Sequence, residues 1–175
     1  NKWSVEEIRG WLAENIAPIP EYDTISIDNP QQIISYYVYH LVHSFSHVVL
    51  KYATSLIGME RTSISEYLLP RSLSFITYTN QRTDFSLGGM HALVESGLDD
   101  LMEQISQDGD NCVYDPVCSR DGSTCFNCMF TSEVSCSHLN RNLGRDFMFG
   151  SRRIADRDLI GFFEVAGAAS GSGDN

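Results

Sequence analysis

All five cysteines of this 175-residue chain fall within one short segment, CVYDPVCSRDGSTCFNCMFTSEVSC, which runs from Cys112 to Cys136. We call residues 112–136 the cysteine segment. It is rich in turn-forming residues and poor in apolar ones, so it cannot fold by burying a core of its own. Something else must hold it together, and its cysteines are the candidates.

The spacing of the cysteines indicates a metal site. Cys125 and Cys128 form a C-x2-C knuckle, which presents two thiolates to one ion. Cys118 lies seven residues before the knuckle and Cys136 eight residues after it. Four thiolates that converge from a turn-rich loop are typical of a tetrahedral structural zinc site, which has no open position for catalysis. The sequence therefore predicts Zn²⁺ bound by these four residues.

Two alternatives to zinc stay open for the cysteines. An iron–sulfur cluster also takes four thiolates. Disulfides would tie the same segment, although an odd number of cysteines favours them less. Cys112 is the remaining cysteine: a turn at Asp115-Pro116 could bring it close to Cys118 as a replacement ligand, but we expect a small buried hydrophobe.

The composition limits the function classes. The formal net charge of −11 at pH 7 argues against a surface built as a whole to bind nucleic acid, and leaves room only for a local basic patch. No run of about 18 apolar residues occurs, so we expect no membrane-spanning helix. No G-x-x-x-x-G-K-[ST] loop occurs, so the chain is not expected to be an ATP-hydrolysing enzyme.

Hydrophobic periodicity predicts an α+β fold that is predominantly helical with a small β-sheet. Helices are expected over residues 4–16, 31–57, 63–69, 90–105, 137–149 and 154–165, and a strand over 73–79. We expect three parts: an N-terminal helix and linker (1–30), a main domain (31–150), and a C-terminal helix with a disordered tail (151–175). Gly88 and Gly89 could form an anion cradle at a helix N-terminus, although a tight turn explains them equally well.

The long helix expected over 31–57 separates two kinds of side chain. Its core stripe consists of Ile34, Leu41, Phe45, Val48 and Tyr52. His40, His43 and His47 fall on nearly the opposite side. His43 and His47 are four residues apart, a spacing that can chelate a metal from one helix face. We expect ordinary hydrogen bonds to neighbouring loops there, with a second metal site or a catalytic pair as alternatives.

Basic residues gather behind the cysteine segment, and four of them are candidate contacts to nucleic acid or to a partner: Arg141, Arg145, Arg152 and Arg153. A helix over 137–149 would turn Arg141 and Arg145 away from its apolar stripe, where they could meet phosphate groups. Pairing with the acidic stretch 95–110 of the same domain is the competing interpretation.

Together these motifs resemble a known family. The order HSFSH (43–47), a strand, LGGM (87–90), CVYDPVC, CFNC, SEVSC and NRNLGR is similar to the helicase-associated C-terminal zinc-binding domain of DrmB-type phage-defence proteins and MrfA-type DNA-repair helicases. The likeness covers about residues 41–150. It implies zinc ligands at Cys118, Cys125, Cys128 and Cys136, and the family often has a cysteine at the position of Cys112 as well.

The resemblance implies a non-catalytic, cytoplasmic module of a larger assembly that acts on DNA in antiviral defence or repair. Such a module would dock onto a helicase or another subunit, and contact with DNA is a further expectation. The alternative is a small hydrolase that uses His43 and His47, with Cys112 or Asp115 as the neighbouring group.

Overall fold

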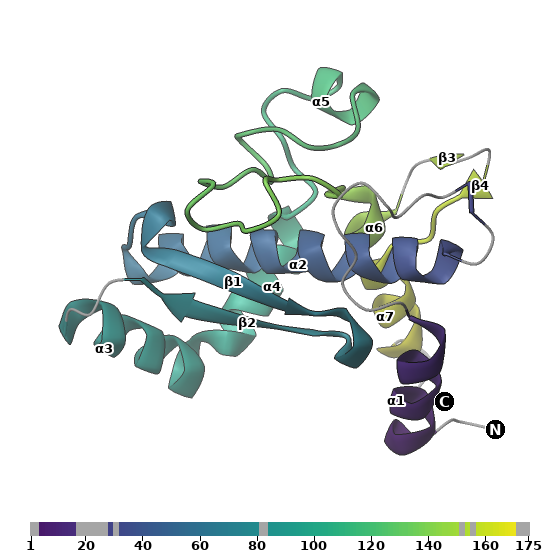
Figure 1. The fold of residues 1–175 in the computed structure, drawn as a ribbon. Coiled ribbons are helices and arrows are strands. Elements are labelled where there is room, and N and C mark those ends of the chain that lie inside the picture. The colour runs from purple at the N-terminus through teal and green to yellow at the C-terminus, as the bar shows by residue number, and fades with distance from the viewer. Residues whose placement is uncertain are drawn as a thin grey trace.

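The computed structural model describes residues 4–16, 28–29, 32–80, 84–150, 153–154 and 157–170. The fold is α+β and predominantly helical, as the periodicity predicts. The long helix α2 (Ile33–Ile57) runs through its middle, with a two-stranded sheet along one side and α4 (Leu98–Asp108) behind it (Figure 1). The chain segment that carries the cysteines lies against a further side of α2.

Helix α2 is packed both on its predicted apolar stripe and on the side that carries the histidines. It ends at Gly58, whose φ of 68° is the left-handed conformation that favours glycine at this position. Of the predicted core stripe, Val48 is buried and the other members are partly buried. His43 and His47 are also fully buried. The side of α2 that carries polar residues therefore needs partners inside the protein.

The sheet is an antiparallel hairpin of β1 (Ile64–Leu69) and β2 (Ser74–Thr79), paired from Ile64 with Thr79 to Leu69 with Ser74. The strand predicted over 73–79 is confirmed. The helix predicted over 63–69 is wrong, because pairing with β2 overrides the local capping-box signal. Burial of Glu66 on this strand is the feature that bears on function.

A nearly continuous helical stretch follows the hairpin. It consists of α3 (Asp84–Ala92), a π-helical turn (Leu93–Gly97) and α4, so the helix predicted over 90–105 is confirmed, and its weak point at Gly97 is the end of the π turn. Gly88 and Gly89 lie inside α3 and form neither an anion cradle nor a turn. A Cβ added at Gly89 would lie 3.4 Å from the Ile57 Cβ, so glycine permits close packing there.

The region after Cys136 differs most from the prediction. Instead of a helix over 137–149, only α6 (Asp146–Phe149) forms, because Leu139, Asn140 and Asn142 have φ angles of 54° to 57°. Beyond it, the helix predicted over 154–165 is replaced by an antiparallel pair, β3 (Arg153–Ile154) and β4 (Arg157–Asp158), followed by α7 (Phe162–Ser170). Helix α7 enters the expected tail, and residues 171–175 lie outside the described residues.

Helix α1 (Val5–Asn15) begins at the predicted capping box, where the Glu7 N–H donates to Ser4 Oγ at 3.2 Å. Its C-terminal end docks on the hairpin turn, since Arg71 Nε donates to the Ile16 carbonyl oxygen at 2.9 Å. The linker expected up to residue 30 lies mostly outside the described residues, and the division into three parts stays a prediction. Among the helices that the structure describes, none is long and apolar enough to cross a membrane.

Candidate metal centres

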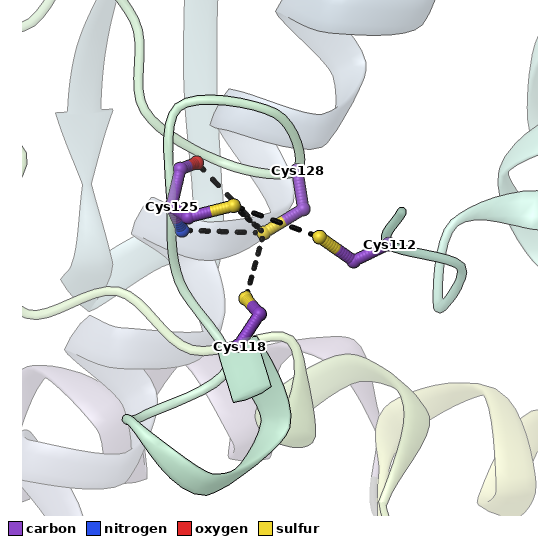
Figure 2. Close-up of side chains that lie close together, drawn as sticks. All are labelled: Cys112, Cys118, Cys125 and Cys128. Atoms are coloured by element: carbon purple, nitrogen blue, oxygen red, sulfur yellow. Dashed lines mark hydrogen bonds between the residues drawn. The ribbon is translucent and has the colours of Figure 1, made fainter. Parts of the chain in front are cut away.

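Four sulfur atoms converge where the chain after α4 folds back on itself (Figure 2). They belong to Cys112, Cys118, Cys125 and Cys128, and all lie within 4.8 Å of one another. The Cys125 sulfur is 3.6 Å from those of Cys112 and Cys128, and the Cys118 and Cys128 sulfurs are 3.6 Å apart. A disulfide needs about 2.05 Å, whereas metal–sulfur bonds of about 2.3 Å in a tetrahedron separate sulfurs by about 3.8 Å. The spacing therefore fits one metal ion.

The membership of this set differs from the predicted one by one cysteine. Cys112 takes the place expected for Cys136, so the expectation of a small buried hydrophobe at Cys112 is corrected. The turn through Asp115 and Pro116 returns the chain, with the Asp115 N–H donating to the Cys112 carbonyl oxygen at 3.0 Å. The short helix α5 (Val117–Arg120) then brings in Cys118.

Backbone and side-chain donors surround these sulfurs, as thiolate ligands require. The Cys125 N–H donates to Cys128 Sγ at 3.3 Å, and Asn127 Nδ2 donates to Cys112 Sγ at 3.8 Å. Burial alone would raise the pKa of Cys125, but the backbone N–H groups of Cys128 and Asn127 lower that pKa to about 7. Burial instead raises the pKa of Cys118, to about 11, and that of Cys128. Cys125 is therefore the member that ionises most readily, and metal binding would release the protons of the other thiols.

Arg145 is part of this centre and not an outward contact. Its side chain is buried, with a relative exposure of 1% for the residue. Its Nη2 lies 3.0 Å from both carboxylate oxygens of Asp115 and 3.8 Å from Cys118 Sγ, and its Nη1 lies 3.6 Å from Asp110 Oδ1. The expected helix does not form, so Arg145 is not placed on the surface where the predicted contact to nucleic acid or a partner requires it. Pairing with nearby acids is what the structure shows.

The other predicted arginine contacts have separate outcomes. Arg141 is exposed on a turn, where its N–H donates to the His138 carbonyl oxygen at 3.1 Å. Arg152 and the side chain of Arg153 lie outside the described residues. Of the two predicted arginine contacts whose side chains the structure describes, Arg141 is exposed and Arg145 is buried, so these two do not share one surface.

A second cluster lies on the histidine face of α2. His43, His47, Glu66 of β1 and Cys136 each bring one ligand atom to within 4.8 Å of the others, and all four are buried. Glu66 Oε1 is 3.1 Å from Nε2 of both histidines, and Cys136 Sγ is 3.3 Å from His43 Nε2. Burial would lower the pKa of His47, but hydrogen bonds with Cys136 and Glu66 raise it to about 10.

The sequence indicates only half of this second cluster. The i, i+4 spacing of His43 and His47 is the signal that points to it. The predicted helix over 63–69 contains Glu66 but does not form, and the cysteine spacing assigns Cys136 to the other set. Cys118 and Cys136 lie at similar distances in sequence from the knuckle, so the spacing alone predicts the same metal site for both. Cys136 lies instead with the histidines of α2, because its turn packs on the hairpin.

Comparison with known proteins gives one relationship to a defence system. No family model matches the chain. The chain is similar to the DISARM protein DrmB of Bacillus paralicheniformis, with 29% identity over 127 residues, which is 63% of this chain and 22% of that protein. It therefore spans only 22% of the length of this relative. The similarity supports a DISARM-related relationship.

Replacing Arg145 by Gln should destabilise the protein far more than replacing Arg141 by Gln. The first change removes a buried guanidinium that hydrogen-bonds the partly exposed carboxylate of Asp115, and a hydrogen bond to a charged group contributes about 1.5–3 kcal/mol. Arg141→Gln changes an exposed residue, where even loss of a surface ion pair costs no more than about 1 kcal/mol. Chemical denaturation measures both, and equal effects of the two variants would contradict the inward role of Arg145.

Proposed function

We propose that this chain is a zinc-stabilised, non-catalytic module of a larger anti-phage defence assembly. The observation that carries the proposal is the convergence of four cysteine sulfurs at the spacing of a single ion. A four-thiolate site uses all its positions for protein ligands, so it serves folding and not catalysis. The defence context is supported by the similarity to the DISARM protein DrmB.

Zinc is the ion that this donor set favours. Thiolates are soft ligands that select zinc or iron over magnesium and calcium. Bound zinc would supply folding free energy, on the order of 10 kcal/mol in small zinc modules, to a segment with few apolar residues. Cysteine spacing that fits a metal ion and not disulfides is usual for proteins of the reducing cytoplasm, which is the location that we propose.

Docking onto a protein partner is the second part of the proposal. Four apolar side chains beside the cysteine ligands face solvent, with relative exposures of 80% for Val113, 60% for Tyr114, 61% for Val117 and 78% for Phe126. The loop around α5 stands away from α2 in Figure 1. Exposed apolar groups gathered on a rigid loop are typical of protein interfaces. A helicase or another subunit of the assembly is the proposed occupant.

Direct contact with DNA is a more limited part of the proposal and rests on Arg141. Arg141 is exposed, and an arginine at the surface is a common contact for a phosphate group. A formal net charge of −11 opposes broad electrostatic binding, so any contact must be local. Arg145 is not included because it is buried.

The hydrolase alternative receives no support from the geometry. His43 and His47 are buried, and the two groups expected beside them, Cys112 and Asp115, belong to the other centre. The cavity next to His47 has a volume of about 10 Å³, which is room for no more than about one water molecule. A substrate therefore has no space at this cavity.

Replacing Cys112 by Ser should reduce the zinc content of the purified protein by one equivalent per chain and lower its melting temperature. The reason is that Cys112, not Cys136, completes the set with the knuckle. Val113→Ser, at the adjacent exposed position, is the matched control and should change neither quantity. Elemental analysis and thermal denaturation measure the two effects, and full zinc content in Cys112→Ser would refute the assignment.

Replacing Phe126 by Ser should weaken docking without affecting the zinc content. Truncation of an aromatic anchor at an interface costs about 2 kcal/mol or more. The measurement is the recovery of partner subunits with the tagged protein from cells that contain the whole assembly. Val94→Ser, which truncates another exposed side chain in the π turn, is the control. Undiminished recovery with Phe126→Ser would show that this loop is not the interface.

Arg141→Glu should weaken DNA binding by the intact assembly and reduce its salt dependence by about one phosphate contact. Arg9→Glu makes the same charge change on the exposed face of α1 and should leave the salt dependence as it is. Binding measured over a range of salt concentrations separates the two. An unchanged slope for Arg141→Glu would remove DNA contact at this residue from the proposal.

A further inference from the structure

We propose that His43, His47, Glu66 and Cys136 form a second zinc site. We call these four residues the buried centre. The inference goes beyond the proposed function and does not depend on it, because it concerns different ligands on different elements. The ligand class is a divalent transition-metal ion bound by two imidazoles, a carboxylate and a thiolate, a combination that suits zinc.

The distances within the buried centre fit one tetrahedral ion. Zinc–nitrogen and zinc–oxygen bonds of about 2.0–2.1 Å place neighbouring ligand atoms about 3.3–3.4 Å apart. Glu66 Oε1 lies 3.1 Å from Nε2 of His43 and of His47, and Cys136 Sγ lies 3.3 Å from His43 Nε2. The fourth ligand completes the shell, so the site is closed and its role is structural.

The hydrogen bonds of His47 direct its other nitrogen, Nε2, at the centre. Its Nδ1 lies 2.8 Å from the carbonyl oxygen of Met129, which can only accept, so Nδ1 carries the proton. In a neutral imidazole Nε2 is then an acceptor, yet it faces the Glu66 carboxylate, which also accepts. A proton or a metal cation between these two acceptors resolves the conflict, and zinc would take the place of the proton that His47 holds in the metal-free protein. A backbone carbonyl on the second nitrogen is also the usual support of a metal-binding histidine.

Further contacts orient the other ligands. Ser46 Oγ hydrogen-bonds the second oxygen of Glu66, which leaves Oε1 for the ion. His43 Nδ1 has no protein partner among the described residues, and the ring instead packs against Tyr39 and His138, with centroid distances of 5.9 and 5.3 Å. The ligands are thus held in place by hydrogen bonds and packing before any ion binds.

The charge of the buried centre suits its depth. One carboxylate and one thiolate carry two negative charges, the imidazoles are neutral, and Zn²⁺ brings the total to zero. A neutral cluster avoids the large cost of leaving a net charge in the protein interior. All four residues are at most 3% exposed, so water cannot supply the compensation instead.

The buried centre would join three parts of the fold. The histidines belong to α2, Glu66 to β1, and Cys136 to the turn at the end of the cysteine segment. That turn already lies on the hairpin, because the Glu66 N–H donates to the Ser135 carbonyl oxygen at 3.2 Å and Ser65 Oγ donates to that of Val134 at 3.2 Å. An ion would lock the hairpin and the cysteine segment onto the central helix.

The competing possibility is a metal-free cluster in which a proton on a histidine takes the place of the ion. Elemental analysis of the purified protein distinguishes the two. We expect two zinc ions per chain, one ion in Glu66→Gln, and two in His40→Gln, which changes a buried histidine of the same helix outside the cluster. One zinc per chain in the unmodified protein after exposure to excess zinc, or two in Glu66→Gln, would overturn the proposal.

A cobalt titration keeps the test decisive should Glu66→Gln fail to fold. Co²⁺ added to Cys112→Ser should still give the absorption of one tetrahedral ion with a weak thiolate charge-transfer band, from the single sulfur of Cys136. Absence of any tetrahedral signal from that variant, while the unmodified protein gives only a four-thiolate spectrum, would contradict the buried centre. A four-thiolate spectrum from the unmodified protein would leave the proposed function intact, because the four-cysteine centre would still bind its ion.

Discussion

Buried polar side chains around α2 need hydrogen-bond or charge partners inside the protein, and most of the structure depends on those partners. A buried polar or charged group without a partner costs more than most packing contacts return. Ser44 Oγ accepts the Gly144 N–H at 2.9 Å, His47 meets Glu66 and the Met129 carbonyl oxygen, and Arg145 meets Asp115. The Ser44 and His47 contacts with Gly144 and Met129 bind the loop-rich region 109–145 to the helix. The His47–Glu66 contact joins the helix to the hairpin, and the Arg145–Asp115 contact holds the loop region to itself.

Each of the two proposed centres would place a metal ion and its charged ligands inside the protein, and the net charges of the two centres differ. A divalent ion with four thiolates carries a net charge of −2, so that centre needs cations nearby. Arg145 lies 3.8 Å from Cys118 Sγ, and Lys51 interacts electrostatically with Cys128 and Cys112. The buried centre is neutral with zinc bound and can lie deep between α2 and the hairpin. This difference explains why one set is partly exposed and the other is not.

Local patterns in the sequence predict what depends on local physics. The capping box at Ser4, the long helix that ends at Gly58, and the C-x2-C knuckle all appear as expected. Features that depend on contacts between distant residues could not be read in this way. Glu66 belongs to a strand only because β2 pairs with it, and Cys136 leaves the predicted set only because the hairpin brings its turn to His43. Left-handed residues after Cys136, which periodicity does not reveal, turn Arg145 inward.

The central claim is that two ions of different ligand sets hold the cysteine segment to the central helix. X-ray absorption at the zinc edge of the purified protein tests it most directly, because it reports the ligand atoms of every bound zinc. We predict a mixed shell, with sulfur at about 2.3 Å and nitrogen or oxygen at about 2.0 Å, and with sulfur as the majority, five of eight ligands over the two proposed sites. A pure sulfur shell would contradict the buried centre, and a shell without sulfur would contradict both.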